Sequence, residues 1–214
     1  MLILVSNIKV ENFLHPYVRF LNASPSLVGA DFYLGSRLYA PNLGFGCFSS
    51  YIKVPRGTQE FIITEAGNRN KEIARLSLPF NQGEVYTVAA VHSDGNTMAY
   101  GIAEPTDKSN MQYGNVRICH LSPILREADV SANGRKILQN IDYLEISKYI
   151  CMTPDMYEFG VTDSDSGRVR LVMPGQNVRS GKYNTLYIVG TNNEATPLMG
   201  LFSVDAASYN GYYL

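Results

Sequence analysis

The chain has 214 residues, which is enough for one large domain or for two domains of about 100 residues. Its net charge is −1 and it has no run of basic residues, which argues against a nucleic-acid partner, because phosphate backbones require clustered Lys and Arg. No apolar stretch approaches the roughly 20 residues of a membrane-spanning helix.

The first segment, residues 1–16, is an N-terminal extension in which four apolar residues follow Met1. A secretory signal has a basic region and a longer apolar core, and neither is present here. We therefore expect synthesis in the cytoplasm. Within this segment Ile8, Lys9 and Val10 alternate in the manner of a β-strand.

An internal repeat organises the rest of the chain. Residues 18–91 align without a gap with residues 116–189, which lie 98 positions later. Such self-similarity indicates a duplicated structural unit. We expect a first repeat over residues 17–103, a linker over 104–113, a second repeat over 114–204 and a tyrosine-rich tail over 205–214. The tail could add a strand to the sheet of a neighbouring molecule.

Both repeats read as short β-strands separated by turns. Segments rich in β-branched and aromatic residues recur between turn signals such as Gly35-Ser36 and Asn133-Gly134. The pattern predicts an all-β protein of two tandem antiparallel sandwiches of the immunoglobulin or transthyretin type. Alternation places Val18 and Phe20 on one face of the first strand, and Arg19 and Leu21 on the other.

The same alternation predicts the core of each sandwich. It places a set of large apolar side chains on the inward faces: Phe61, Ile63, Tyr157, Phe159 and Val161.

The repeats share an Arg, a Ser-Pro pair and an Asp, and the second adds a histidine. These signature residues are Arg19, Ser24, Pro25, Asp31, Arg117, His120, Ser122, Pro123 and Asp129. A Ser-His-Asp triad is rejected, because the first repeat has Asn22 where the second has His120. We expect a structural role instead, in which the first two strands form a hairpin and Arg19 pairs with Asp31 across it.

Other candidate sites are read as structural. Residues 163–167, DSDSG, begin like a calcium loop but lack its later ligands, so a turn is expected. Cys47, Cys119 and Cys151 do not align between repeats, so free thiols are expected, with a Cys119–Cys151 bridge as an alternative. His15, His92 and His120 are scattered. We expect no metal site and no cofactor.

The repeated motifs also resemble a known bacterial family. Residues 17–38, YVRFLNASPSLVGADFYLGSRL, residues 51–68, YIKVPRGTQEFIITEAGN, and residues 84–91, EVYTVAAV, are similar to those of the domain of unknown function 4397. The resemblance covers the chain as two tandem copies. It implies sandwich domains that are often found on bacterial envelope proteins, with forms lacking a signal in spore-forming bacteria, and it implies no particular activity.

Three functions remain open at this point. The first is a non-enzymatic structural or adhesive module of the cell envelope or spore surface, which binds itself or other envelope or spore-coat proteins. The second is a small-ligand or glycan-binding module that uses the groove between the domains or the loops at a sandwich end. The third is a hydrolase that uses His120 and nearby acids.

Overall fold

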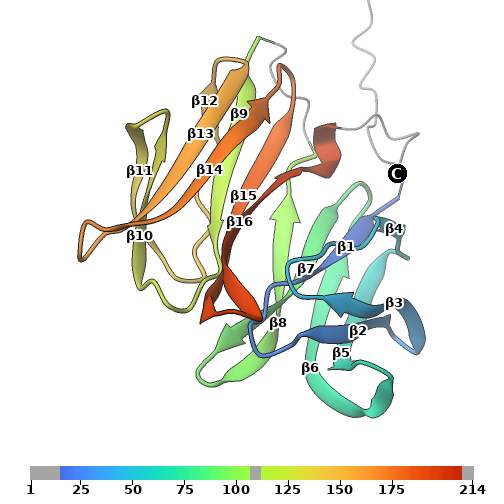
Figure 1. The fold of residues 1–214 in the computed structure, drawn as a ribbon. Helices are drawn as coiled ribbons and strands as arrows, with labels where there is room; N and C mark the ends of the chain where they lie inside the picture. Colours follow the sequence, from blue (N-terminus) through green and yellow to red (C-terminus); the bar gives the residue numbers. More distant parts are fainter. Residues whose placement is uncertain (1–14, 107–111, 209–214) are drawn as a thin grey trace, which may run out of the picture.

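The computed structural model describes residues 15–106 and 112–208, and it forms two β-sandwiches that pack against each other (Figure 1). The expected strand at Ile8–Val10 and most of the tyrosine-rich tail lie outside these residues. No helix in the described part of the chain is long and apolar enough to cross a membrane. The all-β fold of two tandem sandwiches confirms the prediction made from the turn and strand pattern.

Each repeat contributes eight strands to the described structure. Those of the first repeat are β1 (Tyr17–Asn22), β2 (Gly29–Leu34), β3 (Arg37–Gly44), β4 (Ile52–Lys53), β5 (Gly57–Glu65), β6 (Asn68–Phe80), β7 (Val85–Ser93) and β8 (Asn96–Glu104). Those of the second are β9 (Gly114–His120), β10 (Glu127–Ala132), β11 (Arg135–Asp142), β12 (Ile150–Met152), β13 (Asp155–Asp163), β14 (Val169–Val178), β15 (Tyr183–Asn193) and β16 (Thr196–Val204). A short 3-10 helix, η1 (Ala206–Ser208), follows β16.

Four sheets of four strands build the two sandwiches. The first sandwich has the strand orders β4-β1-β7-β8 and β3-β2-β5-β6, and the second repeats them as β12-β9-β15-β16 and β11-β10-β13-β14. The first strand of each repeat is central and pairs in parallel with a strand far along the chain, β1 with β7 and β9 with β15. These pairings place Arg19 beside Thr87 and Arg117 beside Thr185.

The expected hairpin between the first two strands is therefore wrong. β1 and β2 lie in different sheets of the first sandwich, and β9 and β10 are separated in the same way in the second. The segment between them, which holds the Ser-Pro pair, carries the chain from one sheet to the other. Local alternation predicted which side chains share a face but could not predict which strands are neighbours.

Each sandwich has its own apolar core, and a third core joins the two. The predicted core residues Phe61, Ile63, Phe159 and Val161 are fully buried, and Tyr157 packs against the second core. The third core lies between the repeats and takes residues from both of them. Its fully buried members are Leu21, Ala23, Ala89, Val91, Ile102, Cys119, Leu121, Tyr187 and Val189. The outward face of β1, which carries Leu21, is thus the face that meets the second sandwich.

Proline marks the outer strands of the sheets. Pro41 lies in β3, Pro79 in β6, Pro174 in β14 and Pro197 in β16, each of which is an outer strand of its sheet. Proline has no N–H to donate to a neighbouring strand, so it is tolerated where one side of the strand is unpaired. It also discourages pairing with another chain.

Truncation of a buried aromatic residue tests the second core. Phe159→Ala should lower the free energy of unfolding by about 3–5 kcal/mol, because it leaves a cavity beside Phe202 and Tyr157. Val169→Ala, at a residue that is 64% exposed on β14, is the control and should change stability by less than about 0.5 kcal/mol. Urea denaturation measures both, and similar losses in the two variants would contradict this assignment of the core.

Candidate functional site

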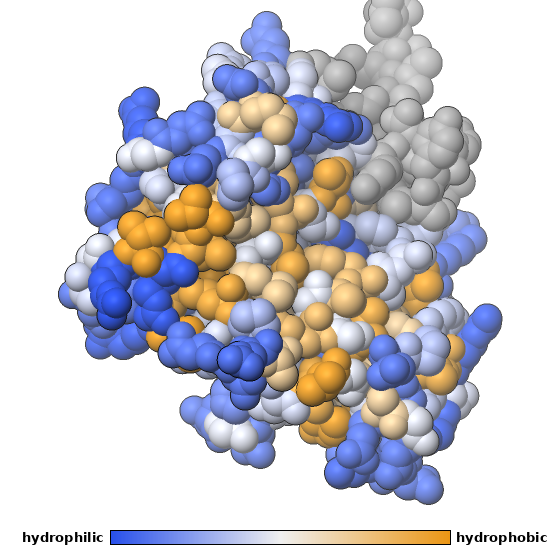
Figure 2. All heavy atoms as spheres, in the orientation of Figure 1, coloured by the Kyte–Doolittle hydropathy of each residue, from blue (hydrophilic) through white to orange (hydrophobic). Residues whose placement is uncertain are grey.

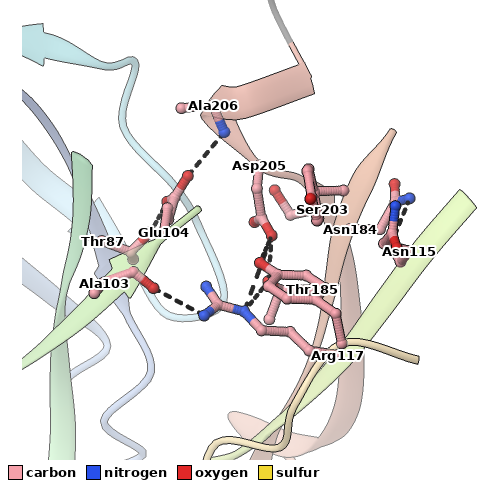
Figure 3. A network of polar contacts seen from close by, with 12 residues as sticks. Thr87, Ala103, Glu104, Asn115, Arg117, Asn184, Thr185, Ser203, Asp205 and Ala206 are labelled. Atoms are coloured by element: carbon pink, nitrogen blue, oxygen red, sulfur yellow. Dashed lines mark hydrogen bonds and ion pairs between the residues drawn. The ribbon is translucent and has the colours of Figure 1, made fainter. Parts of the chain in front are cut away.

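The most elaborate polar cluster of the described residues is buried where the two sandwiches meet (Figure 3). Its charged members are Arg19 on β1, Arg117 on β9, Glu104 at the end of β8 and Asp205 just after β16. None of the four is more than 6% exposed. Arg19 and Arg117 point into this interface because alternation directs their neighbours on the same strands into the separate cores.

Arg19 contacts both carboxylates of the cluster. Its Nε lies 3.2 Å from Glu104 Oε1, and its Nη2 lies 3.3 Å from Asp205 Oδ1. It also donates to Thr87 Oγ1 at 2.8 Å, to Ser203 Oγ at 2.6 Å and to Tyr187 OH at 3.3 Å. Glu104 belongs to the first repeat and Asp205 follows the second. One guanidinium therefore joins the two sandwiches.

Arg117 occupies the corresponding position in the second repeat but has fewer partners. It donates to Thr185 Oγ1 at 2.9 Å and to the Ala103 carbonyl at 2.8 Å, while its nearest carboxylate oxygen, on Asp205, is 4.0 Å away. Its buried Nη2 has no hydrogen-bond partner among the described residues.

The difference between the two arginines follows from the residues across the interface. Arg19 reaches Tyr187 on β15 and Ser203 on β16. The strand registers give Ala89 and Ile102 as their counterparts in the first repeat. Neither of these side chains can accept a hydrogen bond, so Arg117 lacks the acceptors that Arg19 has.

The two acids are equivalent, although the 98-residue offset does not relate them. Glu104 pairs with Val85 at the end of β8, and the Asp205 N–H donates to the carbonyl of Tyr183, the counterpart of Val85. A bulge in β15 at Thr191 and Asn192 belongs to the longer β15–β16 hairpin, which moves the second acid to a larger offset. Both acids fall in the predicted linker and tail, outside the aligned repeats, so they were not recognised as a pair from the sequence. An acid at the end of each last strand was the available signal.

Tyrosines and threonines complete the carboxylate environment. Tyr51 donates to Glu104 Oε2 at 2.7 Å, and Tyr149 donates to Asp205 Oδ2 at 2.6 Å. Burial raises the pKa of both phenols, so they remain protonated donors. Burial and the neighbouring Glu104 raise the pKa of Asp205 to about 6, so this carboxyl is ionised at neutral pH. The cluster sets two guanidinium groups beside two carboxyl groups and is suited to holding the sandwiches together.

The Ser-Pro segments are turns whose side chains are also engaged. The Leu27 N–H donates to the Ser24 carbonyl at 3.1 Å, which places Pro25 at the second position of a β-turn, where its fixed φ is favoured. Pro123 has the same place in the turn from Ser122 to Leu125. The Ser24 hydroxyl bonds to Thr97 Oγ1 and the Ser122 hydroxyl donates to the Gly190 carbonyl, both at 2.7 Å.

His120 holds this turn in the second repeat, as Asn22 does in the first. His120 Nε2 lies 3.0 Å from the Leu125 carbonyl, and its Nδ1 accepts from the Ser122 N–H at 3.4 Å. Asn22 donates to the Leu27 carbonyl at 3.0 Å and accepts from the Ser24 N–H at 3.3 Å. Burial lowers the pKa of His120 to about 4. Both ring nitrogens are thus committed to the backbone, which leaves no nitrogen for a substrate.

The aspartates that the two repeats share bind backbone N–H groups at strand bulges and do not bind arginines. Asp31 accepts from the N–H groups of Asn42 at 2.7 Å and Gly67 at 2.9 Å, and Asp129 accepts from the Asn140 N–H at 2.9 Å. Asn42 and Asn140 both have a positive φ, at 43° and 51°. The expected Arg19–Asp31 ion pair is therefore wrong, since these side chains are bound in different sheets to other partners.

The remaining sequence candidates are also accounted for. The Asp163 carboxylate accepts from the N–H groups of Asp165 and Ser166, both at 3.1 Å, which makes residues 163–167 a turn. No group of acids, histidines and cysteines in the described part of the chain is arranged to hold a metal ion. Cys47, Cys119 and Cys151 are free, and burial raises the pKa of the Cys119 thiol to about 12.

Removing either arginine tests the asymmetry of the cluster. Arg19→Met should lower the free energy of unfolding by about 3–5 kcal/mol, because it leaves two buried carboxylates without their shared cation. Arg117→Met should cost less, because Arg117 lies farther from any carboxylate and has an unbonded Nη2. Urea denaturation of both variants measures the difference in the free energy of unfolding, and equal losses in the two variants would contradict the prediction.

His120→Asn tests the turn and its pH dependence. The variant should fold, because Asn22 makes the equivalent bonds in the first repeat. The pKa of His120 is about 4 when folded and 6.5 when unfolded, so the unfolded chain binds more protons between these values. Acidification from pH 6.5 to 4 should then lower the free energy of unfolding of the native chain by up to about 3 kcal/mol. The variant should not show this loss, because it lacks the histidine. Parallel pH profiles of stability would refute this.

The chain is similar to one protein family and, more distantly, to solved structures. No curated protein matches the chain. A carbohydrate-binding module of family CBM26 from Eubacterium rectale Amy13K, solved with maltoheptaose, is 12% identical with a TM-score of 0.26, and the match covers 90% of this chain and 97% of that one. The Bacillus anthracis TIE protein is 12% identical with a TM-score of 0.29, covering 82% of this chain and 34% of that one.

These structural likenesses are too distant to carry an argument about ligands. The family match is more informative, because residues 16–126 and 114–209 each match the model of a domain of unknown function, DUF4397. The two matched segments overlap over residues 114–126, and each includes one complete sandwich. The chain therefore belongs to the DUF4397 family and contains two tandem copies of its domain.

Proposed function

We propose that the chain is a non-enzymatic structural or adhesive binding module of the bacterial cell envelope or spore surface, and that it acts through protein–protein assembly. One observation carries the proposal. The signature residues that could have served catalysis are occupied in holding turns, bulges and the contact between the sandwiches. Chemistry at these positions would require breaking contacts on which the fold depends.

The contact between the sandwiches supports a role as one rigid unit. Besides the charged cluster, Phe48 of the first repeat packs on Tyr187 of the second, with ring centroids 5.4 Å apart. Tyr100 of the first repeat donates to the Leu144 carbonyl of the second at 3.0 Å, and Tyr143 of the second repeat donates to the His92 carbonyl of the first. Each repeat thus contributes side chains that contact the other repeat. A rigid pair presents its surfaces in a fixed arrangement, which suits assembly.

An apolar surface supports protein–protein contact. The strands β14, β16, β8 and β6 are each one of the two outer strands of their sheets, and we call the side of the molecule that they form the edge-strand face. Figure 2 shows apolar side chains gathered over this face. Val169 and Val172 on β14 are 64% and 49% exposed, and Met98 on β8 is 36% exposed. Contiguous exposed apolar area of this kind is typical of interaction sites.

The assembly state tests the proposal. Analytical ultracentrifugation over a range of concentrations should show association of the native chain, and Val169→Lys combined with Val172→Lys should abolish it, because charge is costly to bury in an interface. Val28→Lys is the matched control, since Val28 is 73% exposed on the turn between β1 and β2 and is not on β14. A native chain that stays monomeric throughout contradicts self-assembly.

Fractionation of growing and sporulating source cells with an antibody to the protein tests the location. Recovery in the envelope or spore-coat fraction is the expected outcome. Purely cytosolic recovery under both conditions would count against the proposal.

A second candidate function is glycan binding, which a groove on the second sandwich favours. The groove has a volume of about 310 Å³ and is lined by Asn177, Arg179, Lys182, Asn184, Phe202 and Val204. Asn177 and Arg179 place an amide and a guanidinium near the ring of Phe202, and ligand sites commonly combine aromatic lining with a few polar groups. Thermal stabilisation by members of a glycan panel supports this function, because a ligand of the native state raises its stability.

A further inference from the structure

A different groove, on the opposite open side of the second sandwich, has features of a peptide site. It lies between β11 and β12, has a volume of about 410 Å³ and is here called the β11–β12 groove. Ile137, Ile150, Met152 and Tyr157 provide apolar lining and also pack against the second core. Its size is within the range of ligand pockets, roughly 300–1,000 Å³.

The charge of the groove is positive. Arg135 and Lys136 line it, and no carboxylate does. Lys136 is already paired, since its Nζ lies 2.6 Å from Asp129 Oδ2. Arg135 is exposed, and its guanidinium has no ion pair, hydrogen bond or ring contact within the described ranges. The guanidinium of Arg135 is thus available to a ligand at the edge of an apolar groove.

The first repeat shows what an occupied arginine looks like at this position. Arg37 is the counterpart of Arg135, and its guanidinium lies over the ring of Tyr39, 4.8 Å from the centroid. In the second repeat Ile137 stands where the first has Tyr39, so Arg135 has no ring to cover. The free arginine is therefore a specific property of the second repeat.

The walls of the groove favour an extended peptide over a sugar. β11 and β12 are the outer strands of their sheets, and each has backbone groups on one side that no neighbouring strand covers. Peptides bind such edges in extended form and place alternate side chains in a pocket. The single aromatic ring of the lining is poorly suited to stacking, because Tyr157 packs against Phe159 and its hydroxyl donates to the Thr153 carbonyl at 3.0 Å.

We propose that the β11–β12 groove binds an extended acidic peptide segment of a partner protein. An apolar side chain of the segment covers Ile137 and Met152, and an adjacent Asp or Glu pairs with Arg135. A guanidinium and a carboxylate form two parallel hydrogen bonds in such a pair, which fixes the register of the segment. This inference concerns a different surface from the edge-strand face and stands independently of self-assembly.

Titration of the full chain with a model peptide tests the proposal. The probe is acetyl-Thr-Val-Glu-Val-Thr-amide, followed by backbone amide NMR shifts. Shifts should concentrate on residues of β11 and β12. Arg135→Ala should weaken binding roughly tenfold or more, as expected for the loss of a charged hydrogen bond. Ile137→Tyr, which copies the first repeat, should also weaken binding, because the added ring covers the floor and engages Arg135.

The controls separate this site from general charge attraction. Arg37→Ala removes the matched arginine of the first repeat and should leave the affinity unchanged. A peptide with Gln in place of Glu should bind the native chain weakly. Its affinity should equal that of the Glu peptide for the Arg135→Ala variant. Equal binding of the Glu and Gln peptides, no binding at millimolar peptide, or binding of an oligogalacturonate in place of the peptide would each overturn the proposal.

Discussion

The arrangement of the two sandwiches depends on one buried guanidinium. Arg19 lies between Glu104 of its own repeat and Asp205 beyond the end of the other, and all three are almost fully buried. Burying three charges costs desolvation free energy that their attraction offsets only with good geometry and further hydrogen bonds. Thr87, Tyr51, Tyr149 and Ser203 supply those bonds. The third apolar core favours contact between the repeats, and the cluster selects a single relative orientation.

Duplication created two copies of this cluster, and the copies have since diverged. Each repeat brings an Arg on its first strand, a Thr beside it and an acid at the end of its last strand or directly after it. A symmetric interface would satisfy both arginines equally. Tyr187 and Ser203 face Arg19, whereas Ala89 and Ile102 stand in the matching positions near Arg117, so one buried donor is left unbonded. An unsatisfied buried group costs about 1–3 kcal/mol, so we expect Arg117 to contribute less to stability than Arg19.

Sequence reasoning recovered what local alternation determines. The faces of β1, the core positions Phe61 and Phe159, the Ser-Pro turn and the tandem copies were all predictable from periodicity, turn chemistry and self-similarity. The neighbour of β1 was not, because β7 lies far along the chain and no local pattern encodes that pairing. The acids Glu104 and Asp205 were missed for a related reason. The longer second hairpin, with its bulge, changes the offset between the repeats after Val189, so a gapless alignment cannot superpose them.

Residues that are identical in the two repeats and residues that differ between them have different roles, and this difference bears on where function lies. The signature residues of the two repeats hold turns, bulges and the interface, so they are constrained by contacts within the chain. Position 39 of the first repeat and position 137 of the second lie outside that set, and they differ, with Tyr in one and Ile in the other. Arg37 rests on Tyr39, while its counterpart Arg135 has a free guanidinium beside an apolar groove. Such unshared positions can give the two repeats different binding surfaces on the same fold, because function resides in sites carried by a fold and not in the fold itself.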